Sequence, residues 1–167
     1  MTALHQFSLP GPMLRRGFWL YVWRVESPNG AVHYVGRTGD NSSPRATAPY
    51  TRMGQHLGFI KNQNALRKHL EKRGLSVEDS LSFDLLAHGP IYPEVDHDGS
   101  DRDTLMERHK PIRNQVGAME KLLCDGLREA GYDVMNIVNC RWELSAEGEE
   151  KWAAAKEAFR QAFPALR

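Results

Sequence analysis

Two neighbouring stretches near the N-terminus have the composition of paired β-strands. Residues 18–25, FWLYVWRV, are mostly β-branched and aromatic, and residues 31–36, AVHYVG, follow after the turn sequence Ser-Pro-Asn-Gly. A proline followed by Asn-Gly favours a tight reversal of the chain. The pattern therefore predicts a β-hairpin over residues 18–36.

The remainder of the chain has mainly helical patterns, with one further strand. Residues 80–89, in which apolar and polar positions alternate, predict that strand. Apolar residues at helical spacing predict five helices, over residues 50–60, 64–74, 103–110, 113–131 and 145–163. Pro111 is expected to end the third of these helices. The order of elements indicates an α+β fold, a small, mainly antiparallel three-stranded sheet flanked by helices.

The 167 residues have the length of one domain, and 41% hydrophobic with 26% charged residues is ordinary for a globular protein. No apolar run approaches the ~18 residues of a membrane span. The N-terminal segment has no small-residue cleavage site after its aromatic run, so we expect a cytoplasmic protein with no membrane partner. Cys124 and Cys140 belong to no Cys/His cluster, so a structural zinc site is not expected.

The formal net charge of +1 conceals an uneven distribution of charge along the chain. Residues 1–75 contain 11 Lys and Arg against 3 Asp and Glu, a net +8, whereas residues 76–167 carry a net −7. A basic half can give one face of a fold a positive field that attracts nucleic acid. The alternative is that the fold interleaves the two halves and the field averages out.

The predicted hairpin carries polar groups that a hairpin does not need. Tyr21 and Tyr34 lie on its two strands, where cross-strand neighbours share one face. Downstream, Arg52 and His56 lie four positions apart on one face of a predicted helix, and Glu120 lies at the edge of the apolar stripe of a later helix. Arginine suits the geometry of a phosphate, and a lone carboxylate can hold one Mg²⁺. This set suits the hydrolysis of a phosphodiester.

The same residues resemble the motifs of the GIY-YIG nuclease superfamily. LYV at 20–22 and YVG at 34–36 match the paired motifs of the family's hairpin, although Trp19 stands where the first motif has glycine. The later family positions are matched, in order, by Arg52, His56, Glu120 and Asn136. The resemblance is to the compact, restriction-endonuclease-like branch, because the large DNA-binding domains and Cys-rich zinc modules of other branches are missing.

The resemblance implies a division of the chain. Arg52 and Glu120 lie 68 positions apart, which is longer than the compact family core and implies an insertion between them. We expect an N-terminal arm at residues 1–16 and a nuclease core at 17–139, with an insertion within the core around 59–112. A C-terminal helix at 140–167 would pack on the core.

The resemblance also implies a role for each site residue. Tyr21 would activate or position the nucleophilic water with help from His56, and Tyr34 would be a second water- or phosphate-positioning group. Arg52 would bind the scissile phosphate. Glu120 would be the metal ligand, for Mg²⁺ with Mn²⁺ as a substitute.

Several assignments have alternatives. Asn136 would hold the local backbone, a role for which Asn139 competes, and Glu107 and Glu129 compete with Glu120 for the metal.

The residues expected to contact nucleic-acid phosphates are Arg37, Arg45, Lys61, Arg67 and Lys68. The histidines without metal-ligand spacing, which we expect to be solvated, are His88, His97 and His109.

The expected function is that of a Mg²⁺-dependent DNA endonuclease of the GIY-YIG type, in a restriction, phage or defence setting. RNA stays open as a substrate. A homodimer is expected by the same resemblance, since double-strand cleavage usually needs two active sites. The alternatives are a non-catalytic nucleic-acid-binding module that retains the fold, and a small globular protein that matches the motifs by accident.

Overall fold

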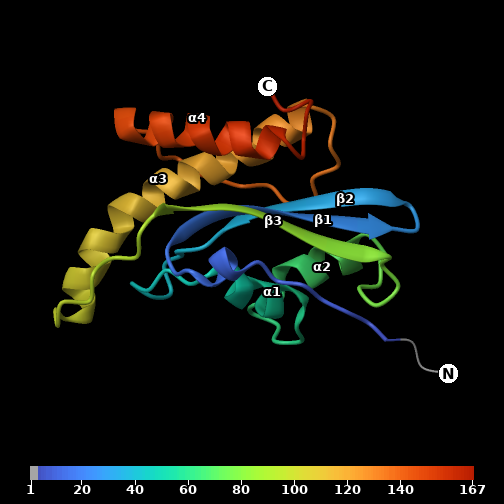
Figure 1. The fold of residues 1–167 in the computed structure, drawn as a ribbon, viewed down its shortest axis with the longest axis horizontal. Helices are drawn as coiled ribbons and strands as arrows, with labels where there is room; N and C mark the ends of the chain where they lie inside the picture. The colour runs from blue at the N-terminus through green and yellow to red at the C-terminus, as the bar shows by residue number, and fades with distance from the viewer. Residues whose placement is uncertain (1–3) are drawn as a thin grey trace.

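A three-stranded sheet lies between two pairs of helices in the computed structural model, which describes residues 4–167 (Figure 1). The elements in chain order are η1 (Gly11–Leu14), β1 (Phe18–Ser27), β2 (Gly30–Arg37), α1 (Pro49–Leu57), α2 (Ala65–Lys72), β3 (Ser82–Tyr92), α3 (Arg102–Glu129) and α4 (Ala146–Arg160). The strand order is β2-β1-β3, and both pairs are antiparallel. The predicted α+β class and three-stranded sheet are confirmed.

The central strand β1 is buried on both faces, because α3 and α4 cover one side of the sheet and α1 and α2 cover the other (Figure 1). Leu20 packs in the cluster that contains Met119 of α3. Tyr21 points to the opposite face and packs in the cluster that contains Leu70 of α2. Burial on both faces explains why the stretch FWLYVW shows no alternation of apolar and polar positions.

The predicted hairpin is confirmed, and its register places both tyrosines on one face. Tyr21 pairs with Gly36, and Trp23 pairs with Tyr34. Residues two apart on a strand share a face, so Tyr21 and Tyr34 are diagonal neighbours on the side covered by α1 and α2.

The helices predicted over residues 103–110 and 113–131 are a single helix, so the prediction that Pro111 ends a helix was wrong. Pro111 is exposed, and so is Glu107, the residue whose carbonyl loses its usual partner. His109 and Val116, one on each side of the proline, are fully buried. This packing holds both segments in one helix and outweighs the missing hydrogen bond.

The third strand runs further than predicted, from Ser82 to Tyr92, and passes through Pro90. Pro90 lies in an edge strand, at the irregularity between the Phe18–Tyr92 and Leu20–His88 pairs, which is where a sheet tolerates proline. The range 59–112 thus contributes this edge strand to the sheet, together with α2 and the first turns of α3. The segment expected to be an N-terminal arm contains one short 3-10 helix, η1.

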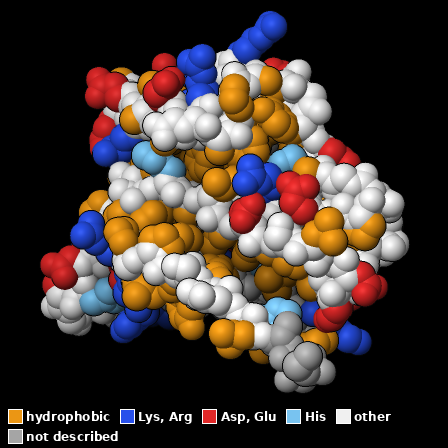
Figure 2. All heavy atoms as spheres, turned by 45° about the vertical axis from the view of Figure 1, so that its right-hand side comes forward, with side chains coloured by type: hydrophobic (Ala, Val, Ile, Leu, Met, Phe, Trp, Pro, Cys, Tyr) orange, Lys and Arg blue, Asp and Glu red, His pale blue; other side chains and the backbone are white. Residues whose placement is uncertain are grey.

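The described surface carries both signs of charge. On the face shown in Figure 2, Lys and Arg side chains are interspersed with Asp and Glu, so neither sign dominates it. Within residues 4–167, no helix combines the length and the apolar character that crossing a membrane requires.

Candidate active site

A pocket of about 400 Å³ opens where the hairpin meets α1 and α3. Its lining includes five of the six predicted catalytic residues, namely Tyr21, Tyr34, Arg52, His56 and Glu120. These side chains come from β1, β2, α1 and α3, which are spread over most of the chain. We refer to this cavity as the central pocket.

The phenol of Tyr21 faces the imidazole of His56 inside the central pocket. Tyr21 Oη lies 3.3 Å from His56 Nε2, and the two rings meet edge to face. The ring of Tyr34 also packs edge to face with this imidazole, and its centroid lies 5.2 Å from that of His56. The histidine is thereby held by both tyrosines.

Burial sets the protonation states of this group. It raises the pKa of Tyr21 well above its ordinary value, and burial with the nearby Glu120 charge raises the pKa of Tyr34 to about 12. Burial, with the neighbouring positive charge of Arg52, lowers the pKa of His56 to about 4. At neutral pH both tyrosines are therefore protonated and His56 is neutral, so one of its ring nitrogens can accept a proton.

The low pKa of His56 leads to a prediction about stability. The unfolded chain binds a proton on this histidine near its ordinary pKa of ~6.5, whereas the folded chain does so only near pH 4. The contribution of neutral His56 to the free energy of unfolding is therefore fully present above pH ~6.5. On the order of 3 kcal/mol of this free energy is lost as the pH falls towards 4. Urea unfolding followed by circular dichroism should show a shallower loss of stability over this range in His56→Gln. Parallel curves for the variant and the wild type would contradict the buried neutral histidine.

Gly36 allows the ring of Tyr21 to lie directly across the hairpin. A Cβ atom at Gly36 would lie 2.5 Å from Cε2, Cζ and Oη of Tyr21. Atoms of a fully packed ring cannot be approached so closely without a shift of the ring. The glycine of the YVG stretch is thus required by the position of the tyrosine hydroxyl.

We expect Gly36→Ala to destabilise the fold by about 1–3 kcal/mol, because its Cβ overpacks the Tyr21 ring. In a Tyr21→Leu background the same change should be neutral or stabilising, since alanine is otherwise favoured over glycine in a strand by about 0.5–1 kcal/mol. A urea-unfolding double-mutant cycle measures this reversal of sign. Equal effects in the two backgrounds would show that the ring does not determine the glycine.

Arg52 lies in the wall of the central pocket with its guanidinium only partly satisfied. Nη2 donates to Asp40 Oδ2 at 2.5 Å, and Nη1 donates to Gln55 Oε1 at 3.1 Å. The buried Nε has no hydrogen-bond partner within residues 4–167. Each terminal nitrogen makes one hydrogen bond and carries two N–H groups, so the guanidinium has donors left for an anion in the pocket.

Asp40 is a site residue that the sequence analysis missed. Burial raises its pKa, but hydrogen bonds from Ser42 and Arg52 outweigh this and lower the pKa to about 2. Its carboxylate accepts a hydrogen bond from one terminal nitrogen of Arg52, a group that can also bind a phosphate. The only sequence signal was an acidic residue directly after the YVGRTG stretch.

Glu120 faces the central pocket from α3 and forms an ion pair with Arg37. Its Oε2 accepts from Arg37 Nε at 2.9 Å, and its Oε1 accepts no hydrogen bond from residues 4–167. Burial raises the Glu120 pKa, and the positive charges of Arg37 and Arg52 oppose this only in part. The competing glutamates Glu107 and Glu129 are exposed and lie outside the pocket.

Asn136 lies outside the central pocket and binds the backbone of β2. Its Oδ1 accepts from Val35 N at 2.9 Å, and its Nδ2 donates to Val35 O at 2.8 Å. Beside it, His33 and Val134 form a parallel bridge on the same edge of the sheet. Asn136 thus continues a row of hydrogen bonds along the strand that carries Tyr34, whereas Asn139 is exposed.

The basic residues expected to contact nucleic acid have different surroundings. Arg45, Lys61 and Lys68 are exposed. Arg67 is buried, and its guanidinium donates to Leu57 O at 3.0 Å and to Glu78 Oε1 at 2.9 Å. This arginine therefore joins α1, α2 and the segment after α2, and we leave it out of the proposed nucleic-acid contacts.

His109 is fully buried, so the expectation that it is solvated was wrong. Its ring packs against Phe18, and Nε2 lies 2.8 Å from the carbonyl oxygen of Asp40. The histidine therefore holds the loop that carries Asp40. A signal was present in the sequence, because Leu105, His109, Ile112 and Val116 follow the spacing of one helical face.

Comparisons of the chain with protein-family models, with curated proteins and with solved structures found no match.

Proposed function

We propose that this protein is a Mg²⁺-dependent endonuclease that hydrolyses phosphodiester bonds in DNA with the residue set of the GIY-YIG nucleases. The observation that carries the proposal is that one pocket contains both tyrosines, Arg52, His56 and Glu120. A structural role for these residues would not require five polar side chains from four elements to line a single cavity.

The donor set of the central pocket fits Mg²⁺. This ion is commonly bound by one or two carboxylates and keeps several waters. Glu120 provides one carboxylate with an oxygen that accepts no other hydrogen bond, and residues 4–167 contain no cluster of three or more Asp, Glu, His or Cys side chains that would form a closed site. Bound Mg²⁺ would supply charge stabilisation at the phosphoryl oxygens.

The remaining side chains have roles that follow from their contacts. Arg52 would bind a non-bridging oxygen of the phosphate, which would compete with Asp40 for the guanidinium. Tyr21 would orient the attacking water through its hydroxyl. As that hydroxyl takes a proton from the water, its own proton would pass to Nε2 of neutral His56.

Cleavage of supercoiled plasmid tests the proposed function. We expect nicked and linear products with Mg²⁺ or Mn²⁺ and none in EDTA. The fraction of linear product should rise with protein concentration if a homodimer supplies two active sites. A folded protein that cuts neither DNA nor RNA with either metal would contradict the proposal, and retained DNA binding in EDTA would then support a non-catalytic module.

Arg52→Ala should slow single-turnover cleavage by about 10²–10³-fold, because it removes a donor to charge that develops in the transition state. DNA affinity should change little, and Arg52→Lys should recover little activity because an ammonium cannot reproduce the guanidinium fork. Arg160→Ala, at an exposed position at the end of α4, is the matched control. A large loss of affinity with an unchanged rate would mean that Arg52 only binds substrate.

A further inference from the structure

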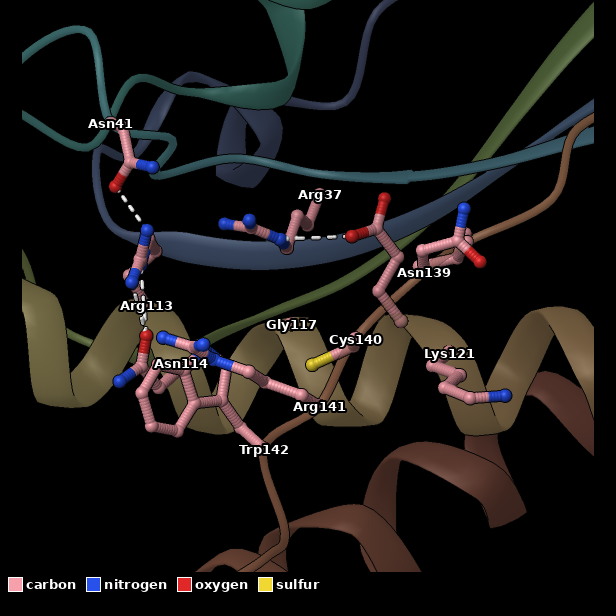
Figure 3. A pocket seen from close by; sticks show the side chains of 12 residues that line it. Arg37, Asn41, Arg113, Asn114, Gly117, Lys121, Asn139, Cys140, Arg141 and Trp142 are labelled. Atoms are coloured by element: carbon pink, nitrogen blue, oxygen red, sulfur yellow. Dashed lines mark hydrogen bonds and ion pairs between the residues drawn. The ribbon is translucent and has the colours of Figure 1, made fainter.

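A second and larger pocket, of about 610 Å³, adjoins the central pocket (Figure 3). The two cavities share Arg37 and Glu120, so this ion pair forms the wall between them. The larger cavity is lined by the end of β2, by α3 and by residues 138–142, which connect α3 to α4. We refer to it as the flanking pocket.

The flanking pocket is lined by four basic side chains, of which Arg37 pairs with Glu120 and Lys121 pairs with Asp125. In Figure 3 the guanidinium groups of Arg37, Arg113 and Arg141 lie on one side of it, and Lys121 points away from them. Arg113 donates to the amide oxygens of Asn41 and Asn114, and within residues 4–167 neither Arg113 nor Arg141 forms an ion pair with a carboxylate. Burial, and then the charges of Arg37 and Arg141, lower the pKa of Arg113. A bound anion would relieve this repulsion.

The pocket also contains a flat aromatic surface beside the positive charge. Trp142 is 42% exposed, and the guanidinium carbon of Arg141 lies 4.6 Å from the centre of its ring. Exposed tryptophan and stacked arginine are the groups on which unpaired bases stack in proteins that bind single-stranded nucleic acid. Anionic and planar groups are thus accommodated in the same cavity.

We propose that the flanking pocket binds one nucleotide of the substrate strand, with its phosphate on Arg113 and Arg141 and its base against Trp142. The inference rests on the proposed function, because the shared wall of Arg37 and Glu120 places this nucleotide next to the phosphate held in the central pocket. A base that stacks on Trp142 leaves its duplex, so the site favours an unpaired or distorted nucleotide beside the cut.

Binding of a fluorescently labelled oligo(dT) in EDTA tests the site without cleavage. Arg113→Ala combined with Arg141→Ala should weaken binding and reduce the slope of log affinity against log salt by about 0.7 for each phosphate that the variant no longer neutralises. Trp142→Ala should weaken binding by about 5- to 150-fold with an unchanged salt slope, because it removes stacking and no charge. Arg160→Ala is the control for loss of a remote surface charge.

An abasic oligomer of equal length separates base stacking from other effects of the tryptophan. Trp142→Ala and the wild type should bind this oligomer equally, and Trp142→Phe should keep most of the affinity for oligo(dT). Equal binding of oligo(dT) by Trp142→Ala and the wild type would overturn the base site. Wild-type affinity in the double arginine variant would overturn the phosphate site, and a deficit of Trp142→Ala that persists on the abasic oligomer would show that the tryptophan does not stack a base.

The failure of this inference is distinguishable from the failure of the proposed function. A wild type that binds through these residues but cuts no substrate would contradict the nuclease and retain the nucleotide site. A wild type that cuts, with variants whose affinity and salt slope are unchanged, would contradict the flanking pocket alone.

Discussion

Glu120→Gln should reduce DNA cleavage by about 10³-fold or more, because the metal ion it would hold contributes several kcal/mol of transition-state stabilisation. The fold should survive. Glutamine has nearly the same shape, and its amide oxygen can still accept the hydrogen bond from Arg37 Nε. Single-turnover cleavage of plasmid across a titration of Mg²⁺ measures the loss.

The matched control is Glu107→Gln, which makes the same chemical change at an exposed position of the same helix. Circular dichroism and thermal unfolding check that both variants fold. If Glu120→Gln cut plasmid at the wild-type rate, Glu120 would not be the metal ligand, and neither Glu107 nor Glu129 could replace it in the central pocket.

Tyr21→Phe should reduce the cleavage rate by about 10²–10⁴-fold, the range expected for the loss of general acid–base help. The change removes one hydroxyl, and the ring keeps its packing between Gly36 and the hydrophobic cluster that contains Leu70 of α2. Because the hydroxyl faces His56, adding His56→Gln to Tyr21→Phe should cost little more.

Tyr50→Phe, at an exposed position of α1, is the matched control for loss of a phenolic hydroxyl. Single-turnover rates for the two single variants and the double variant give the coupling between Tyr21 and His56. A fully active Tyr21→Phe enzyme would make this tyrosine a packing residue. Additive effects would mean that the two residues act independently.

Local patterns in the sequence were sufficient to predict the elements that depend on local interactions. The hairpin follows from β-forming residues around an Asn-Gly turn, and α1, α2 and α4 follow from apolar spacing. Pro111 was misinterpreted because its cost is local, whereas the packing of His109 and Val116 that offsets it involves distant segments. A sequence window around a proline contains no information about that packing.

The candidate site also has features that the sequence predicted and features that it did not. The meeting of Tyr21, Arg52 and Glu120 was predicted from motif order, but the partners of these residues were not. The pairing of Arg37 with Glu120 depends on where α3 crosses the end of β2, and the pairing of Asp40 with Arg52 depends on a loop held by a buried histidine. Such contacts are set by tertiary geometry and leave no periodic trace in the sequence.

The two-sided burial of β1 ties the position of the Tyr21 hydroxyl to the cooperative unfolding of the whole domain. Regions that open locally carry few buried contacts and exposed backbone hydrogen bonds, whereas β1 is bonded to a strand on each edge and covered on each face. Local opening is therefore not expected at the phenol of Tyr21. Substitutions in the distant core would then lower the fraction of folded molecules while each folded molecule keeps the Tyr21 hydroxyl in the same position.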